Sequence, residues 1–273
     1  MLNATTFTYD GVFSGRYGML IAAVNTENIQ ETAPFIPTIR TAKSPKQRRF
    51  SFAGIEYEEM PRFQFSFMCE DPMPDLVRRE LLTWLVGRNG FKKLHIHQPD
   101  YDNYFYNCIF EETRIIYING YCHGFVLTAT FDSPYCYGRP RKVCVKGDGT
   151  EYKEVTLINE SDIIDNYTFP FVRFKAIEPM DDDMLVSIVN PTDTNDPHRA
   201  FEFIGTTEHS EVTPSEEIKV DNELKIITSS VPGNRLSNFN RNWLRLVPGP
   251  NKLKIKINGE CTVETPTYVK IGF

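Results

Sequence analysis

The fold is decided by the segment FQFSFMCEDPMPDLVRRELLTWLVG, residues 63–87. Its first five residues alternate phenylalanine with polar side chains, so the three rings lie on one face of a predicted strand. The run from Asp71 to Gly87 then begins with Asp and Pro, repeats apolar residues at helical spacing and ends at a glycine. The segment predicts a strand followed by a helix, and this is the one convincing helix of the chain.

Strands are predicted on both sides of this segment. Upstream, residues 7–21 indicate two short strands joined at the turn Asp10-Gly11. Downstream, Asn119-Gly120 predicts a hairpin turn between apolar runs. The expected downstream strands cover residues 94–97, 104–110, 113–118 and 124–131.

The polar stretch at residues 38–49 is predicted to be a loop that opens into apolar alternation at Phe50. Its five cations are Arg40, Lys43, Lys46, Arg48 and Arg49. Such a cluster is able to meet a phosphate backbone or an acidic partner surface, but no aromatic stacking platform is interleaved with it. We interpret it as a solvated or oligomer-contact loop, and these five residues are the candidate interface residues.

A change of rhythm near residues 133–141, rich in turn residues, predicts a domain boundary and divides the chain into residues 1–138 and 139–273. The second part holds short strand candidates separated by polar, Gly or Pro residues, which is typical of a β-sandwich. They are expected at residues 155–158, 171–177, 185–190, 200–204, 217–221, 223–229, 243–247, 251–257 and 268–271.

Composition sets the class of protein. A length of 273 residues is enough for two modest domains, and a 13% aromatic content favours a mainly β protein. The net charge of −6 argues against a chain-wide electrostatic grip on nucleic acid. The sequence has no signal-like start and no apolar span, so we expect that the chain is neither exported by a classical signal nor inserted in a membrane. The six cysteines lack any C-x-x-C pair, so we expect free thiols in a reducing cytosol.

Residues suited to catalysis or metal binding are scattered. His95 and His97 would share one face of a strand, but no further ligand lies at compatible spacing, so a structural pair is favoured over a metal site. The run Asp181-Asp182-Asp183 lacks the order of a calcium loop and is interpreted as a solvated acidic turn. Chance carboxylate pairs cannot nominate a glycosidase, and the common hydrolase, zinc protease and nucleotide-binding motifs are missing. We expect no enzymatic activity, no cofactor and no metal.

Local signatures follow one another in a fixed order along the chain. They are residues 7–18 (FTYDGVFSGRYG), 82–85 (LTWL), 90–94 (GFKKL), 98–106 (QPDYDNYFY), 124–128 (GFVLT), 132–137 (DSPYCY) and, more loosely, 159–162 (NESD), 239–240 (FN) and 246–251 (LVPGPN). Together they resemble the distal tail protein family (Dit) of long-tailed siphovirus bacteriophages.

The resemblance implies a mainly β fold with one helix, of the α+β class. It implies an N-terminal β-barrel or sandwich domain that forms a ring, followed by a galectin-like β-sandwich. Six copies would form a homohexamer at the tail tip, a baseplate hub between the tail tube protein and the tail-associated hub or fibre protein. The protein would be assembled in the host cytoplasm and reside in the virion. DNA would pass through the ring, without sequence-specific binding of nucleic acid and without a membrane partner.

The alternative function is a carbohydrate-binding adsorption module that recognises host cell-wall saccharides. Trp243 and the tyrosines could then be stacking platforms. In a regular strand over residues 242–246, Trp243 would lie on the face opposite Leu244 and Leu246, which leaves its display to solvent open. Core packing of Trp243 is the favoured interpretation, because it lies in a short strand just before a Pro-Gly turn.

Overall fold

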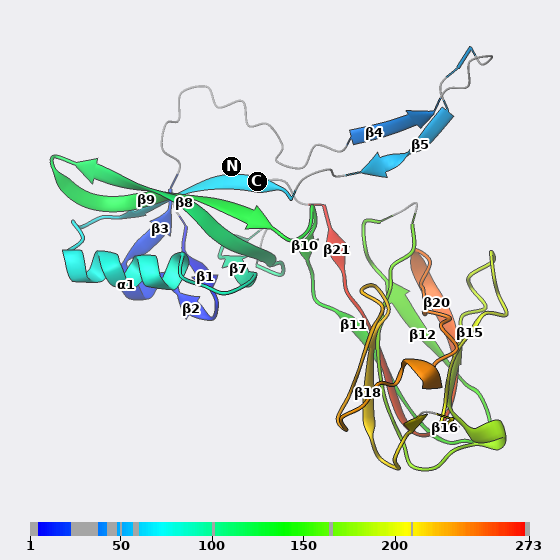
Figure 1. Ribbon diagram of the computed structural model, residues 1–273. Coiled ribbons are helices and arrows are strands. Elements are labelled where there is room, and N and C mark those ends of the chain that lie inside the picture. The colour runs from blue at the N-terminus through cyan, green and yellow to red at the C-terminus, as the bar shows by residue number, and fades with distance from the viewer. Residues whose placement is uncertain are drawn as a thin grey trace. The chain divides into compact units, whose positions relative to one another are not determined.

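The computed structural model describes residues 5–22, 38–42, 48–49, 51–56, 60–99, 102–163, 166–208 and 210–270. The chain divides into two compact units (Figure 1). Unit 1 is Met1–Tyr137 with Lys270–Phe273, and unit 2 is Gly138–Val269. Both are built mainly from β-strands, as the sequence predicts.

Unit 1 is a seven-stranded antiparallel sheet in the order β2-β1-β7-β8-β9-β6-β3. An isolated bridge pairs Ile21, at the end of the edge strand β3, with Thr5, which lies just before β1. The sheet therefore curls towards a half-barrel. The elements of this unit are β1 (Phe7–Tyr9), β2 (Val12–Phe13), η1 (Ser14–Tyr17), β3 (Met19–Ile21), β6 (Arg62–Cys69), α1 (Asp75–Leu85), β7 (Lys92–Ile96), β8 (Tyr106–Ile118), β9 (Tyr121–Phe131) and β10 (Cys136–Tyr137).

Helix α1 covers this sheet through one apolar face. Leu81, Trp84 and Leu85 are buried, and the indole Nε1 of Trp84 donates a hydrogen bond to the backbone oxygen of Tyr9 at 3.0 Å. The Trp84 ring also stacks on Phe7, with ring centroids 5.8 Å apart. The predicted helix is confirmed, and its packing contributes the tryptophan's large apolar area to the core of unit 1.

The two predicted glycine turns are also confirmed. Asp10 and Gly11 have φ angles of 48° and 77°, and Asn119 and Gly120 have φ angles of 50° and 84°. Two successive positive φ angles define the type I′ turn, whose twist matches the strands of a hairpin. The turn at residues 119–120 therefore joins β8 directly to β9.

The prediction of a loop over residues 38–49 is wrong at its start. Residues 38–42 form β4 (Thr38–Ala42), which pairs antiparallel with β5 (Ser51–Glu56). Threonine and isoleucine favour extended backbone, and the cation of this strand stays at the surface, so the charge does not oppose pairing. The ladder shifts register opposite Gly54, whose φ of 140° suits glycine.

Unit 2 is a sandwich of two antiparallel sheets that share one strand. Its elements are β11 (Arg141–Asp148), β12 (Lys153–Asn159), β13 (Phe171–Ala176), η2 (Asp181–Asp183), β14 (Met184–Val189), β15 (Ala200–Ile204), β16 (Thr206–Thr207), β17 (Ser210–Glu211), β18 (Glu217–Asp221), β19 (Ile226–Ser229), η3 (Leu236–Asn238), β20 (Gly249–Thr265) and β21 (Tyr268–Val269).

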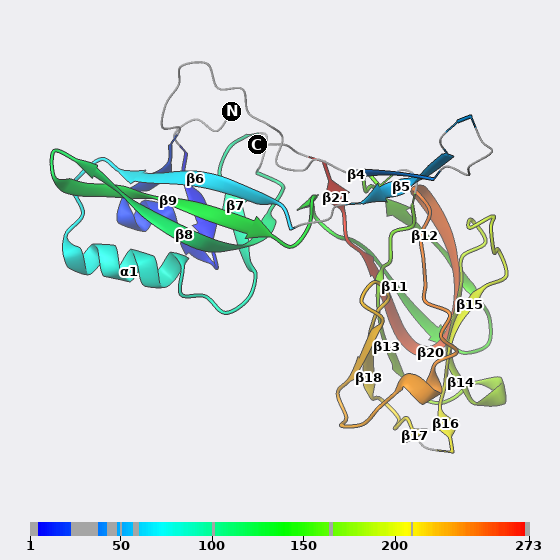
Figure 2. The same cartoon turned by 45° about the horizontal axis from the view of Figure 1, so that its top comes forward.

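Strand β20 is the shared strand, and Figure 2 shows it curving through unit 2. Its first part pairs with β12 on one side and β14 on the other, and its second part pairs with β11 and β13. The strand passes from one sheet to the other at Gly259, which has a φ of 143°. A Cβ atom there would lie 2.2 Å from the backbone oxygen of Lys175, so only glycine fits.

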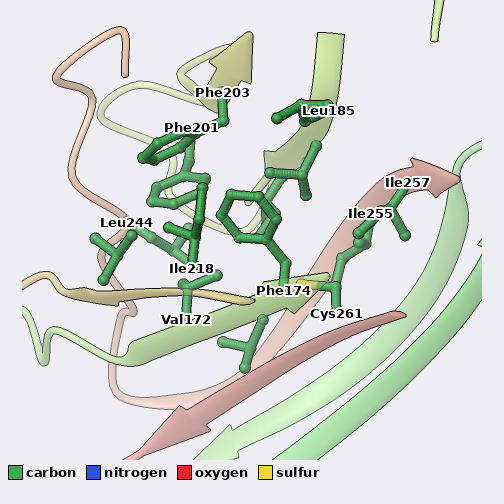
Figure 3. Close-up of a cluster of buried hydrophobic side chains, with 14 of the residues drawn as sticks. Val172, Phe174, Leu185, Phe201, Phe203, Ile218, Leu244, Ile255, Ile257 and Cys261 are labelled. Carbon is green, nitrogen blue, oxygen red and sulfur yellow. The ribbon is translucent and has the colours of Figure 1, made fainter. Parts of the chain in front are cut away.

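The core of unit 2 lies between the two sheets (Figure 3). Phe174 of β13 and Phe203 of β15 meet edge to face with ring centroids 5.1 Å apart, and Ile255 and Cys261 of β20 are fully buried beside them. The alternation of buried and exposed residues along β13 and β18 is the period of two that the sandwich prediction requires.

The predicted strand at residues 243–247 is wrong. This stretch is irregular, with a single bridge from Leu246 to Thr168. Side-chain amides take the place of strand pairing: Asn222 Oδ1 accepts the backbone N–H of Leu244 at 2.7 Å, and Asn251 Oδ1 accepts that of Val247 at 2.9 Å. Buried asparagines thus satisfy the backbone groups that a ladder would otherwise satisfy.

Candidate functional site and interaction surfaces

Three of the five predicted basic interface residues lie on or beside the paired strands β4 and β5, and we call the segment of residues 38–56 the basic arm. Arg40 is exposed on β4, and Arg48 and Arg49 are exposed just before β5. Lys43 and Lys46 lie outside the described residues. Ile39 is 64% exposed on the same strand, so an apolar side chain accompanies the cations at the surface. A two-stranded hairpin is marginally stable in water on its own, so the pairing of β4 with β5 by itself gives the basic arm little stability.

A second exposed surface lies at the tip of the β8–β9 hairpin. The pairing of β9 with β6 ends at Gly124, and the hairpin extends past that point (Figure 1). Its exposed apolar side chains are Ile115, Tyr117, Ile118 and Tyr121, which are 37 to 64% exposed. Sequence reasoning missed this patch. The signal is the run of four apolar residues at 115–118, because a strand covered on one face alone would alternate.

A groove of about 450 Å³ runs along α1, and three arginines are among the residues that line it. Arg16, Arg79 and Arg88 line it, and the guanidinium of Arg16 lies 5.6 Å from the centre of the Tyr17 ring. The hydroxyl of Tyr17 donates to Glu80 at 2.9 Å, which raises the pKa of Tyr17. Arginines therefore outnumber carboxylates in this groove, in contrast to the net negative charge of the whole chain.

The histidine pair is held by structural hydrogen bonds. The rings of His95 and His97 lie edge to face with centroids 4.7 Å apart. Nε2 of His95 is 2.9 Å from the backbone oxygen of Asp102, and Nε2 of His97 is 2.8 Å from Oγ1 of Thr8. Burial, together with the neighbouring His95, lowers the pKa of His97. Among the described residues, no group of three or more His, Cys, Asp or Glu side chains is arranged to hold a metal ion.

The acidic run at residues 181–183 forms the short helix η2. Asp183 accepts a hydrogen bond from the backbone N–H of Thr206, and the backbone N–H of Gly205 donates to the Asp183 carbonyl at 2.7 Å. Asp183 therefore anchors the loop after β15 within unit 2.

Trp243 packs against the core. Its ring meets Phe239 edge to face, with centroids 4.8 Å apart, and the side chain is half-buried against the hydrophobic cluster. Leu244 and Leu246 on either side of Arg245 are buried. These contacts support the packing interpretation of Trp243 over its display as a stacking platform.

Two ion pairs with buried carboxylates fix the loops of unit 2. Arg235 and Glu216 form a two-pronged contact, with Nε–Oε1 and Nη2–Oε2 distances of 2.6 and 3.1 Å. Burial alone would raise the pKa of Glu216, but hydrogen bonds from Arg235, Ser229 and Thr213 outweigh it and hold the pKa below its ordinary value. Arg245 makes a similar 2.6 Å contact with Asp193. Both carboxylate oxygens of Glu216 and of Asp193 accept hydrogen bonds from other groups of the same chain.

The cysteines and helices complete the survey. All six cysteines are free thiols in the structure, which agrees with the part of the prediction that concerns their pairing. Burial raises the pKa of Cys108 and Cys261, so neither is a ready nucleophile. Within the described ranges, no helix has the length and apolar character needed to cross a membrane.

Two family models match the sequence. The phage tail protein N-terminal domain matches residues 2–133, and the phage tail C-terminal domain matches residues 135–266. No curated protein matches the sequence.

Solved phage structures have a similar fold. The Dit protein of phage SPP1, described as a paradigm of the hub adsorption apparatus in phages that infect Gram-positive bacteria, superposes with a TM-score of 0.63 at 14% identity. The match covers 96% of this chain and 98% of that one. Chains of the phage p2 baseplate in its activated conformation, with calcium or with strontium, match with a TM-score of 0.51 at 9% and 8% identity, over 86% of this chain and 88% of theirs.

Proposed function

This chain belongs to the phage tail protein family, whose N-terminal and C-terminal domains it contains in order, and from that membership we propose that it is the distal tail protein of a long-tailed phage. The resemblance drawn from the sequence is confirmed at the level of family and fold. In this proposal the protein has a structural role in the virion, without enzymatic activity. It forms the baseplate hub that joins the tail tube to the tail-tip or receptor-binding apparatus.

The proposed assembly is a ring of six copies closed by unit 1, made in the host cytoplasm. The observation that carries it is the amount of apolar and cationic surface that unit 1 exposes, on the basic arm and on the β8–β9 tip. Surfaces of this kind are typical of protein interfaces, and a closed ring covers each of them by repetition. Unit 2 would be the outward domain of galectin-like architecture, and the tail tube and tail-associated hub or fibre proteins would bind above and below the ring.

Native mass spectrometry of the full chain tests the ring. We expect a dominant species of six copies at high protein concentration. The exposed apolar surface of unit 1 is removed from water only when a neighbouring subunit covers it. A second experiment adds purified tail tubes, because a ring could need the end of the tube as a template before it closes. A chain that stays monomeric in both experiments would contradict the proposal.

Charge reversal of the basic arm tests its role as an interface. The double variant Arg48→Glu, Arg49→Glu should raise the concentration needed for assembly about tenfold or more, because like charges would then face an acidic partner. It should also change the dependence of assembly on salt, since exposed charges are screened. Analytical ultracentrifugation at several salt concentrations measures both effects.

The matched control is Lys252→Glu, Lys254→Glu, which makes the same charge change on exposed positions of β20 in unit 2. This control should assemble like the wild type. If the Arg48, Arg49 variant also assembles normally at every salt concentration, the arm makes no subunit contact. A normal ring whose passage of DNA alone is altered would assign the basic arm to the lumen.

A further inference from the structure

A groove of about 460 Å³ lies on the outer face of one sheet of unit 2, over β13, β18, β19 and β20. The volume falls in the range of about 300–1,000 Å³ that is usual for small-molecule sites. Strand pairing arranges the outward side chains in two rows across the sheet. Because every residue of these rows is fixed on a paired strand, the groove is held open by the sheet itself.

The first row contains the apolar part of the groove. Phe171 on β13 lies opposite Glu264 of β20 on one side and Asp221 of β18 on the other, and Asp221 lies opposite Ile226 of β19. Phe171 is 45% exposed and Ile226 is 50% exposed. A flat ring between two carboxylates offers an apolar face with hydrogen-bond acceptors beside it.

The second row supplies donors. Arg173 lies opposite Thr262 and Lys219, and Lys219 lies opposite Thr228. Oε1 of Glu217 is 3.8 Å from Nε of Arg173 and 3.1 Å from Nζ of Lys219, which restrains both long side chains. A threonine hydroxyl is able to donate and to accept, and that of Thr262 already shares a hydrogen bond with Sγ of Cys144 at 2.8 Å, which restrains it.

One acceptor of the groove, the carboxylate of Asp221, is positioned in advance. Oδ1 of Asp221 accepts the backbone N–H groups of Glu223 and Leu224 at 3.0 and 2.9 Å. The turn therefore fixes the orientation of this carboxylate before a ligand arrives. A group held in place loses less conformational entropy on binding, which favours recognition by a small polar ligand.

The charge of the groove selects the class of ligand. Two cations, Arg173 and Lys219, and two carboxylates, Asp221 and Glu264, line the groove, and Glu217 beside it pairs with both cations, so the site has no excess of positive charge. A polyanion would meet both carboxylates, whereas each hydroxyl of a sugar donates and accepts and can use both kinds of group. We propose that this groove binds a neutral saccharide, with one sugar ring stacked on Phe171 and its hydroxyls bound by the charged side chains and threonines of the two rows.

This activity is additional to the structural role and places the aromatic platform at a different residue from Trp243. A sequence signal for it exists. In a strand from Phe171 to Ala176, every second residue points to the same face, so Phe171 shares its face with Arg173 and Lys175. These two charged side chains favour solvent, which indicates that Phe171 lies on the outer face.

Ligand-observed NMR and calorimetry on the full chain test the proposal. The probes are neutral oligosaccharides of glucose, galactose, N-acetylglucosamine and rhamnose, together with polyglycerol phosphate as an anionic polymer. We expect saturable binding of at least one neutral oligosaccharide. Phe171→Ala should weaken it about tenfold or more, because the stacking face is removed. Phe171→Tyr keeps the ring and should retain binding.

The matched control is Ile158→Ala, on β12 of the opposite sheet, where the side chain is 48% exposed. It should bind like the wild type. The proposal is overturned if no neutral oligosaccharide binds at millimolar concentration, if Phe171→Ala binds normally while folded by circular dichroism, or if only polyglycerol phosphate or a peptide competes for this face. Ring assembly, measured separately, reports on the proposed structural role and not on this groove.

Discussion

Replacing Arg235 with alanine is expected to destabilise unit 2 by about 3–5 kcal/mol, the range for removing one partner of a buried ion pair. The side chain of Glu216 is fully buried and that of Arg235 is 8% exposed. The variant leaves the Glu216 carboxylate without its guanidinium in a site closed to water. Denaturant unfolding of the full chain, followed by a probe that reports on unit 2, measures the loss.

Two comparisons separate this effect from a general sensitivity of unit 2. Arg141→Ala removes an equally short two-pronged contact with Glu160, but that pair is exposed, so the change should be far smaller. Acid provides the second. Because the folded state holds the pKa of Glu216 below its ordinary value, the pair stabilises the fold above that value and ceases to do so as the pH falls through the folded pKa. The difference in the free energy of unfolding between wild type and Arg235→Ala should therefore become smaller in acid. A small difference at neutral pH would refute the prediction.

The second large effect is expected from Gly259→Ala. The left-handed φ of 143° costs an alanine about 1–3 kcal/mol of backbone strain. The added Cβ would lie 2.2 Å from the backbone oxygen of Lys175, and relieving that overlap costs about another 1–3 kcal/mol. Because β20 belongs to both sheets, the strand cannot move away from β13 without disturbing its other neighbours.

Glu260→Ala, one residue further along β20, is the control for Gly259→Ala. It removes an exposed contact with Lys146 and leaves the backbone as it is, so the stability should change by less than about 1 kcal/mol. Thermal unfolding of both variants gives the comparison. A Gly259→Ala protein that unfolds at the wild-type temperature would show that the sheets tolerate a side chain at the crossing.

Regular periodicity was the part of the fold that the sequence predicted well. The alternating phenylalanines of β6 and the helical spacing of Leu81 and Trp84 match their burial, because a one-sided environment imposes its period on the sequence. Asn119-Gly120 predicted its hairpin because few residues other than Gly and Asn adopt positive φ readily.

Sequence reasoning missed elements whose partners lie far away in the chain. The second part of β20 was not predicted, because Asn258, Gly259 and Glu260 have the composition of a turn, whereas here they continue a strand into another sheet. Strand β11 was missed because most of its residues are exposed. The stretch around Trp243 was predicted as a strand, since nothing local indicates that Asn222 and Asn251 replace its ladder.

The candidate surfaces were predictable only in part. The basic cluster was recognised from its charge, but its hairpin form was not, because pairing depends on residues 51–56. The exposed tip of β8–β9 and the outer face around Phe171 depend on which neighbouring strand ends first and which face the second sheet covers. Alternation indicates two faces, but the tertiary fold decides which of them meets water.

The shared strand β20 has a consequence for the synthesis of the protein. Strands β11 to β19 leave the ribosome before β20, yet β11, β12, β13 and β14 each need β20 as a neighbour. Neither sheet can be completed by local pairing, because its partners lie far apart in the sequence. Arg141 of β11 pairs with Thr265 of β20, and Phe171 of β13 pairs with Glu264. Long-range pairing of this kind is slow. The nascent unit therefore waits with open strand edges until its central strand emerges, and this interval is when a chaperone, or the crowding of a second nascent chain, has most influence on the yield of folded protein.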